Sequence, residues 1–191
     1  MPRPDDVGTM THSLWAGGII EQLRDIVESD FPEILALNLS TERETSHLDR
    51  QRLETLLRWS AYGKVITLHG QVRAFIIALA DGAPYENDNY TWFASRMTRF
   101  LYVDRVVVGS EFSGRGLGTR LYEDLFRFAR VNGATTITCE YNIEPPNVAS
   151  RVFHDRFGFK QIGTQWVAGR TKRVSLQAAD ANRLIEPGWH S

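Results

Sequence analysis

The feature that most constrains the fold of this chain is a run of alternating glycines that follows an apolar stretch. Val106–Val108 leads into a turn in which glycine stands at positions 114, 116 and 118. Large apolar residues then repeat at helical spacing, at Leu117, Leu121, Leu125 and Phe128. The sequence therefore predicts a buried strand over residues 100–108, a glycine-rich turn over 109–118, and an amphipathic helix that closes at Asn132–Gly133.

This strand, turn and helix form a candidate anion site. The first turn of a helix has unpaired N–H groups and the positive end of the helix dipole, and glycines lack the Cβ atoms that keep a ligand from the backbone. The common nucleotide loops do not match, because Gly118 is followed by Thr119–Arg120 and the glycine spacing differs from the dinucleotide fingerprint. We favour a main-chain phosphate cradle over glycines that serve turn geometry alone.

The remainder of the chain alternates predicted strands and helices. Apolar or β-branched runs predict strands over 19–26, 64–68, 72–80, 135–141, 159–166 and 171–177. Capping residues predict helices over 29–37, from Ser46 to a terminal Gly63, and over 147–157, with loops over 38–45 and 85–93. This order predicts an α/β (α+β) fold with one mixed sheet and helices on both faces.

Length and composition limit the class of protein. A chain of 191 residues with a net charge of −1 and no basic stripe suits one globular domain and argues against a nucleic-acid partner. The single cysteine, Cys139, excludes a disulfide framework and a cysteine-based metal site, and fits a cytoplasmic protein. No apolar stretch reaches membrane-spanning length. We expect a flexible N-terminal tail over 1–16, a single domain over 17–180, and a C-terminal tail over 181–191.

The glycine run resembles the signature of the GNAT superfamily of N-acetyltransferases, which reads Gln or Arg, two residues, Gly, one residue, then Gly or Ala. Gly116 and Gly118 fill the small positions, whereas Ser113 stands where the family has Gln or Arg. The resemblance implies a mostly antiparallel twisted sheet, acetyl-coenzyme A as acyl donor, and no metal. It also implies these cofactor-binding residues: Val106, Val107, Val108, Ser113, Gly114, Arg115, Gly116, Leu117, Gly118 and Thr119.

A second motif downstream strengthens the resemblance, over the run from Asn147 to Phe159. Asn147 matches a residue that binds the pantetheine arm, Ser150 is the small residue three positions on, and Phe153 precedes the catalytic position. His154 stands where many members carry a tyrosine that protonates the leaving thiolate. The alternatives are that Asn147 is a helix N-cap and that His154 lies on a helix surface.

The reaction implied by the resemblance is attack of an amine on a thioester. An alkylamine has a pKa of about 10, so the enzyme must bind the neutral form or remove a proton. The resemblance implies the Val108 N–H as an oxyanion donor. We expect Asp104 to direct a water to the amine, on a strand face shared with Tyr102 and Val106; a salt bridge from Asp104 to Arg105 is the equal alternative.

The acceptor side of the site is expected near the aromatic segment 85–93 and the strand that carries Cys139. The candidate substrate residues are Tyr90, Trp92, Tyr102, Glu140 and Asn142; the alternative is an aromatic loop that packs on its own sheet. The sequence resembles a bacterial branch of the superfamily, and it leaves a homodimer open. It predicts acetyl transfer to a small amine or amino acid, with a peptide acceptor or a non-catalytic acyl-coenzyme A sensor as alternatives.

Overall fold

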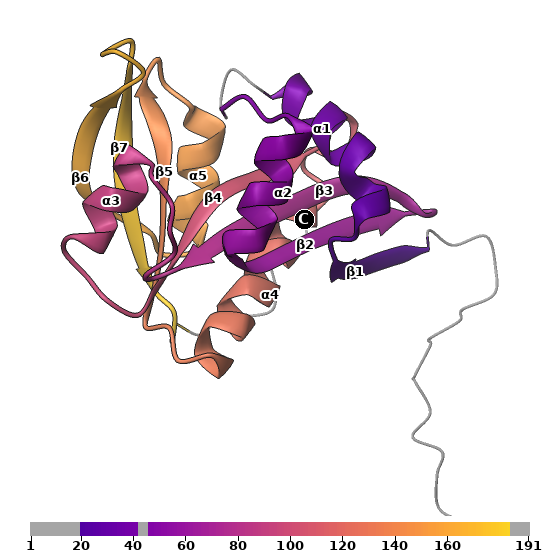
Figure 1. Ribbon diagram of the computed structural model, residues 1–191, viewed down its shortest axis with the longest axis horizontal. Coiled ribbons are helices and arrows are strands. Elements are labelled where there is room, and N and C mark those ends of the chain that lie inside the picture. The colour runs from indigo at the N-terminus through magenta and orange to yellow at the C-terminus, as the bar shows by residue number, and fades with distance from the viewer. Residues whose placement is uncertain (1–19, 42–45, 184–191) are drawn as a thin grey trace, which may run out of the picture.

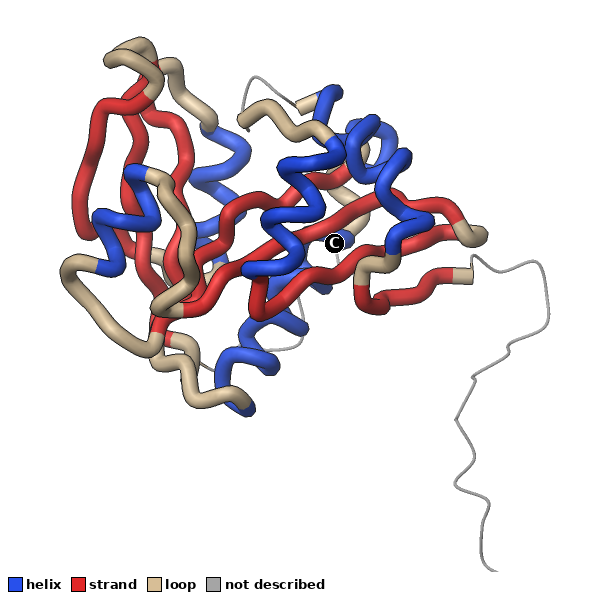
Figure 2. Tube along the Cα trace, in the orientation of Figure 1, coloured by secondary structure: helices blue, strands red, loops and turns tan. Residues whose placement is uncertain are grey.

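The computed structural model describes residues 20–41 and 46–183 (Figures 1 and 2). In chain order the elements are β1 (Glu21–Asp25), the 3-10 turn η1 (Glu28–Asp30), α1 (Phe31–Ser40), α2 (Arg50–Trp59), β2 (Ser60–Leu68), β3 (Gln71–Ala80), α3 (Asp88–Ala94), β4 (Phe100–Val108), the 3-10 turn η2 (Ser110–Phe112), α4 (Leu117–Val131), β5 (Thr136–Glu144), α5 (Val148–Arg156), β6 (Lys160–Val167) and β7 (Lys172–Asp180). The predicted α/β architecture with one mixed sheet is confirmed.

The sheet is twisted and opens along one seam. Its seven strands run in the order β1-β2-β3-β4-β5-β7-β6, and every neighbouring pair is antiparallel except β4 and β5. β4 pairs with β5 only where Phe100–Tyr102 lies beside Thr136–Thr138. Beyond these residues the two halves of the sheet diverge, as Figure 1 shows. The seam between β4 and β5 is therefore a place where main-chain groups are left without a strand partner.

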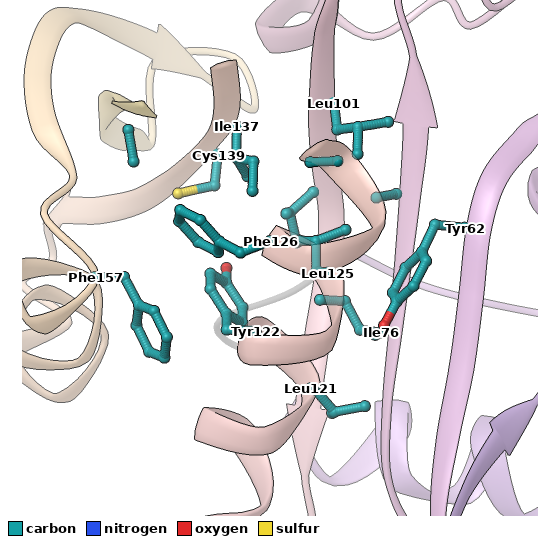
Figure 3. Packing of buried hydrophobic residues seen from close by; sticks show 14 of the residues in the cluster. Tyr62, Ile76, Leu101, Leu121, Tyr122, Leu125, Phe126, Ile137, Cys139 and Phe157 are labelled. Carbon is teal, nitrogen blue, oxygen red and sulfur yellow. The ribbon is translucent and has the colours of Figure 1, made fainter. Parts of the chain in front are cut away.

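Apolar cores cover both faces of the sheet. On one face, the α4 side chains Leu121, Tyr122, Leu125 and Phe126 form a core with the larger residues Tyr62, Ile76, Leu101, Ile137, Phe157 and Phe159. Figure 3 shows Tyr122 and Phe126 projecting from α4 beside Cys139 and Phe157. On the other face, three helices form a second core with the sheet. Its helix residues are Ile34 of α1, Leu53 and Leu56 of α2 and Phe93 of α3, and its sheet residues include Phe75, Phe100 and Tyr102. The burial of Leu121 and Leu125 confirms the helical spacing read from the sequence.

A β-bulge at Asp104 changes which residues of β4 share a face. Arg105 lies opposite Ile77 and Val103 lies opposite Ala78, so Asp104 is the extra residue. Tyr102 consequently packs in the core with α1 and α2, whereas Val106 packs on the α4 side. The expectation that Tyr102, Asp104 and Val106 share one face is wrong, because it assumed an unbroken period of two.

Three local predictions also need correction. Gly63 lies inside β2 rather than at a helix end, because β2 begins directly after α2. Segment 85–93 is not a plain loop, since Asn87 caps a helix, α3. The start of the polar segment 38–45 continues α1 as far as Ser40, and 42–45 lies outside the described residues.

The boundaries of the domain can be compared only in part. Most of the segments expected as tails, 1–16 and 184–191, lie outside the described residues. Ala181, expected in the C-terminal tail, is fully buried in the α4 core and its N–H donates to Thr135. Among residues 20–41 and 46–183, no helix is long and apolar enough to cross a membrane.

Candidate active site

The N-terminus of α4 presents a run of bare peptide amides. Gly114 and Gly116 have φ values of 75° and 80°, the left-handed region that glycine adopts without strain. Gly116 caps α4 without a side-chain hydrogen bond. In the part of the chain that the structure describes, the N–H groups of residues 116–119 have no partner, and the first amide bonded back to the turn is that of Arg120. Four adjacent donors at a helix N-terminus suit an anion such as a diphosphate.

Gly118 has a packing role that differs from that of the other two glycines. A Cβ at this position would meet Phe153 Cε2 at 3.2 Å and Val108 Cγ2 at 3.6 Å. The absence of a side chain thus lets α4 lie close to both α5 and the end of β4. Of the remaining predicted cradle residues, Leu117 is buried in the core and offers only its backbone, whereas Ser113 and Arg115 are exposed.

The end of β4 exposes alternate peptide groups to the seam. Gly109 donates to the carbonyl oxygen of Arg73 at 2.9 Å, and antiparallel pairs alternate between bonded and non-bonded positions. Val108, opposite Ala74, and Val106, opposite Ile76, therefore direct their N–H and C=O groups away from β3 and toward β5. Val107 has the opposite orientation: its peptide groups face β3 and its side chain is buried in the other core.

A cavity of about 570 Å³ lies in the seam. It brings together seven of the predicted site residues: Asp104, Val106, Glu140, Asn142, Asn147, Ser150 and His154. Its other polar walls come from Ser46 and His47 before α2, from the start of α3, and from Lys172 of β7. Val106 at the end of β4 and three residues of the second motif, Asn147, Ser150 and His154, thus border one space, whereas the glycine run does not line it.

Glu140 is a buried carboxyl group with an unsatisfied oxygen. Its Oε1 accepts a hydrogen bond from the Tyr102 hydroxyl at 2.9 Å. Its Oε2 is sealed from solvent and has no hydrogen-bond partner among the described residues. Burial raises the pKa of Glu140 to about 8, and the Tyr102 hydroxyl opposes this rise. A carboxyl group with a pKa near neutrality can exchange a proton with an amine.

Asp104, the predicted base, is already engaged. Its Oδ2 lies 2.7 Å from Arg105 Nε, both side chains are almost fully buried, and its Oδ1 accepts a hydrogen bond from Tyr85. The geometry favours the salt-bridge alternative for Asp104. Glu140, which the sequence indicated only as a substrate contact, is the better placed carboxyl group for proton transfer.

His154, the predicted acid, is buried and bonded through both ring nitrogens. Nδ1 lies 2.7 Å from the Ser150 carbonyl oxygen, and Nε2 lies 2.8 Å from the Tyr122 hydroxyl. Because a carbonyl only accepts, Nδ1 carries the proton and Nε2 accepts from Tyr122. Burial lowers the pKa of His154 to about 4, so the ring is neutral near pH 7. The surface alternative for His154 is wrong, since the residue is 4% exposed.

Asn147 and Ser150 form the start of α5. The Asn147 side chain accepts a hydrogen bond from the Ser150 N–H at 2.9 Å, which is the N-cap alternative read from the sequence. Phe153 packs edge-on against Tyr122, with 5.0 Å between ring centroids. These contacts leave Asn147 at the cavity wall with its capping oxygen already in use.

Three predicted substrate residues, Tyr90, Trp92 and Tyr102, do not line the cavity. Tyr90 is buried, and its hydroxyl donates to Ala80 and accepts from the Ala83 N–H. Trp92 packs on β6, where a Cβ on Gly163 would lie 2.7 Å from Trp92 Cζ2. The Tyr102 hydroxyl donates to Glu140, which borders the cavity, but Tyr102 itself does not. The aromatic residues of α3 thus anchor the helix, because burial of their apolar rings in the core stabilises the fold more than exposure at the surface of a cavity would.

The structure also adds residues that the sequence did not single out. Tyr122 lies one helical turn after Gly118, on the face of α4 that meets α5, so its spacing was a signal for a position near the site. Asn87, Asp88 and Asn89 enter the cavity wall through the N-terminus of α3, which the sequence did not predict. Within the described ranges, no group of three or more His, Cys, Asp or Glu is arranged to hold a metal ion.

Comparison with known proteins gives one family match and several similar folds. The sequence profile of the acetyltransferase (GNAT) family matches residues 20–159, and no curated protein matches the sequence. The fold is similar to that of ribosomal-protein-S18-alanine N-acetyltransferase from Escherichia coli, with a TM-score of 0.66 and 14% identity over 89% of this chain and 99% of that chain. Ard1 from Thermoplasma volcanium gives a TM-score of 0.69 and 15% identity over 84% and 97% of the two chains.

A third solved structure, yncA from Salmonella typhimurium with its cofactor acetyl-CoA, gives a TM-score of 0.65 and 17% identity over 89% of this chain and 99% of that chain. At these identities the likeness shows a shared fold.

Proposed function

This chain belongs to the acetyltransferase (GNAT) family, and from that premise we propose that it moves an acetyl group from acetyl-coenzyme A directly to the amine of a small molecule or amino acid. The observation that carries the proposal is one cavity that both Val106 of β4 and Glu140 of β5 border. A donor held along β4 and an acceptor held at β5 would meet in this space.

Main-chain groups make up the donor side of the proposed site. The amides of residues 116–119 fit a diphosphate in number, direction and dipole, and a side chain on Gly116 would require a strained backbone at φ 80°. The free peptide groups of Val106 and Val108 suit the amide groups of a pantetheine arm. The bound donor supplies an activated thioester, and the Val108 N–H is the candidate to stabilise the oxyanion that develops during attack.

Glu140 is the central residue on the acceptor side of the proposed site. An ammonium ion that enters the cavity finds a buried carboxyl group whose pKa of about 8 lies closer to that of an alkylamine than an ordinary glutamate does. Glu140 accepts the proton, directly or through one water molecule, and the freed nitrogen attacks the thioester carbon. The attacking nitrogen loses its second proton as the carbon–sulfur bond breaks, and the departing thiolate takes up a proton and leaves as free thiol. Cys139 borders the cavity, but its thiol is buried and burial raises its pKa, which disfavours a thiolate and a covalent route.

A small acceptor fits the site better than an extended peptide. Segments before α2 and at the start of α3 both border the cavity. α3 is fixed over the β5–β7–β6 half of the sheet by Trp92 on Gly163 and by a 3.2 Å hydrogen bond from Gln165 to Asn89. This helix occupies the sheet face along which a peptide would have to extend.

Release of free thiol from acetyl-coenzyme A tests the proposal, with a panel of primary amines and amino acids beside short peptides. We expect thiol release that depends on a small amine, with an acetylated product of the matching mass. Acetylation of peptides alone would select the peptide acceptor. Binding of acetyl-coenzyme A without amine-dependent turnover would select the non-catalytic sensor. The Glu140→Gln variant is the matched control, since it keeps the shape of the cavity and removes the base.

A further inference from the structure

We propose that Arg105 is a positioning residue, which ties the bulge of β4 to Asn38 of α1 and to Ser46 before α2 and keeps Asp104 compensated, so that Glu140 remains the cavity's reactive carboxyl group. The inference rests on the proposed function, in which Glu140 accepts the proton of the acceptor amine. Arg105 is not a catalytic residue in this account, because it acts through Asp104 and through the cavity wall.

The contacts of Arg105 are directed to three different partners. Its Nε bonds the Asp104 carboxylate at 2.7 Å, its Nη1 bonds Asn38 Oδ1 at 2.8 Å, and its Nη2 bonds Ser46 Oγ at 3.0 Å. The side chain is 1% exposed. A guanidinium group holds such a fixed set of donors in one plane, which a lysine ammonium does not reproduce.

These contacts fix one wall of the cavity. Asn38 lies in the last turn of α1, and its own side chain donates to the Ser46 carbonyl oxygen at 3.1 Å. Ser46 and His47 border the cavity on the acceptor side. Arg105 thereby holds the end of α1 and the residues before α2 against the strand that carries the bulge. Loss of the planar donor set should loosen this wall and weaken binding of the acceptor.

Arg105 also sets the charge near Glu140. Glu140 is surrounded by polar and titratable groups from several elements. Those that face it are Tyr102, Asp104 and Arg105 of β4, Tyr122 of α4 and Asn89 of α3. Cys139 is its neighbour on β5, and Asp88, His47 and Lys172 line the same cavity. After burial and the Tyr102 bond, the negative charge of Asp104 raises the pKa of Glu140 and the positive charge of Arg105 lowers it. Removing either charge should therefore move the titration of Glu140, in opposite directions.

The test is the pH dependence of kcat/KM, measured with one amine that the wild type acetylates. Asp104→Asn should shift the rising limb of the profile to lower pH and Arg105→Gln should shift it to higher pH, each by about half a unit or more. Arg105→Lys keeps the charge but loses the planar donors. It should leave the limb in place and raise the acceptor KM about tenfold, with the KM for acetyl-coenzyme A unchanged.

Arg24→Gln is the matched control, because Arg24 makes a comparable ion pair with buried Asp30, at 2.6 Å, outside the cavity. It should lower stability without moving either quantity. The inference is overturned if Asp104→Asn leaves the rising limb in place and Arg105→Lys leaves the acceptor KM unchanged, as Arg24→Gln should. This comparison does not need the Arg105→Gln variant, so it stands even if that variant fails to fold. Full activity of Glu140→Gln would instead overturn the proposed base, which separates the two failures.

Discussion

The hydroxyl of Tyr122 lies 2.8 Å from Nε2 of His154, and this contact joins α4 to α5 beside the cavity. The opposite ring nitrogen, Nδ1, is held by the Ser150 carbonyl oxygen. A residue in the motif position of a proton donor is therefore a neutral acceptor, because burial has lowered its pKa to about 4. His154 holds the Tyr122 hydroxyl by this hydrogen bond, and the proposed reaction does not rely on His154 as an imidazolium acid.

His154→Phe should reduce stability more than it changes the pH profile. The variant leaves the buried Tyr122 hydroxyl without an acceptor, which costs about 1–3 kcal/mol. Turnover should slow through altered packing, whereas affinity for acetyl-coenzyme A and the profile between pH 6 and 9 should stay nearly unchanged. Thermal unfolding and kinetics measure these effects. The double variant His154→Phe with Tyr122→Phe should recover part of the lost stability. If His154→Phe instead loses the falling limb of the pH–rate profile at high pH, histidine is the acid after all.

Gly116→Glu should abolish binding of acetyl-coenzyme A. The substitution places a negative charge where a diphosphate would lie and forces a side chain into a backbone with φ 80°, a strain of about 1–2 kcal/mol. Gly133→Glu is a matched control, because Gly133 has φ 75° just past the other end of the same helix. Calorimetry should show normal affinity in the control. Equal loss of affinity in both variants would assign the effect to strain and not to the site.

Glu140→Gln should lower kcat by about a hundredfold or more, the usual contribution of a general base. It should also change how stability depends on pH. Between pH 4.5 and 8 the folded wild type holds a proton on Glu140 that the unfolded chain releases, so wild-type stability falls as pH rises. The variant should therefore melt at a higher temperature than wild type near pH 8 and match it near pH 4. A melting difference that does not vary with pH would contradict the raised pKa.

Gly163→Ala should disturb the acceptor side of the site alone. Its Cβ would lie 2.7 Å from Trp92 Cζ2, so α3 must shift or the strand must yield, at a cost of about 1–3 kcal/mol. We expect a higher KM for the acceptor and an unchanged dissociation constant for acetyl-coenzyme A. Adding Trp92→Phe, which removes the clashing ring atoms, should restore acceptor binding. An unchanged acceptor KM in the single variant would show that α3 does not shape the site.

The sequence predicted those elements whose signals are local. The glycine turn before α4, the apolar spacing along α4 and the N-cap alternative for Asn147 are each determined by neighbouring residues, and the structure contains all three. Prediction was weaker where a tertiary contact decides. α3 is short, and its ring packing on the sheet, such as that of Phe93, could not be read from spacing alone.

In the candidate site, too, local signals could be read from the sequence whereas tertiary contacts could not. The bulge at Asp104 depends on how β3 pairs with β4, and it separates residues that an alternating pattern places together. The environment of Glu140 depends on Tyr102 from another strand, and that of His154 on Tyr122 from another helix. Residue types at the site were therefore predictable, whereas their protonation states and partners required the three-dimensional arrangement.

A crystal structure of this protein with coenzyme A tests the central claim most directly. The account predicts the diphosphate on the amides of residues 116–119, the pantetheine arm beside Val106 and Val108, and the thiol directed into the cavity that Glu140 borders. Coenzyme A bound at another surface, with the N-terminus of α4 free of the diphosphate, would contradict it.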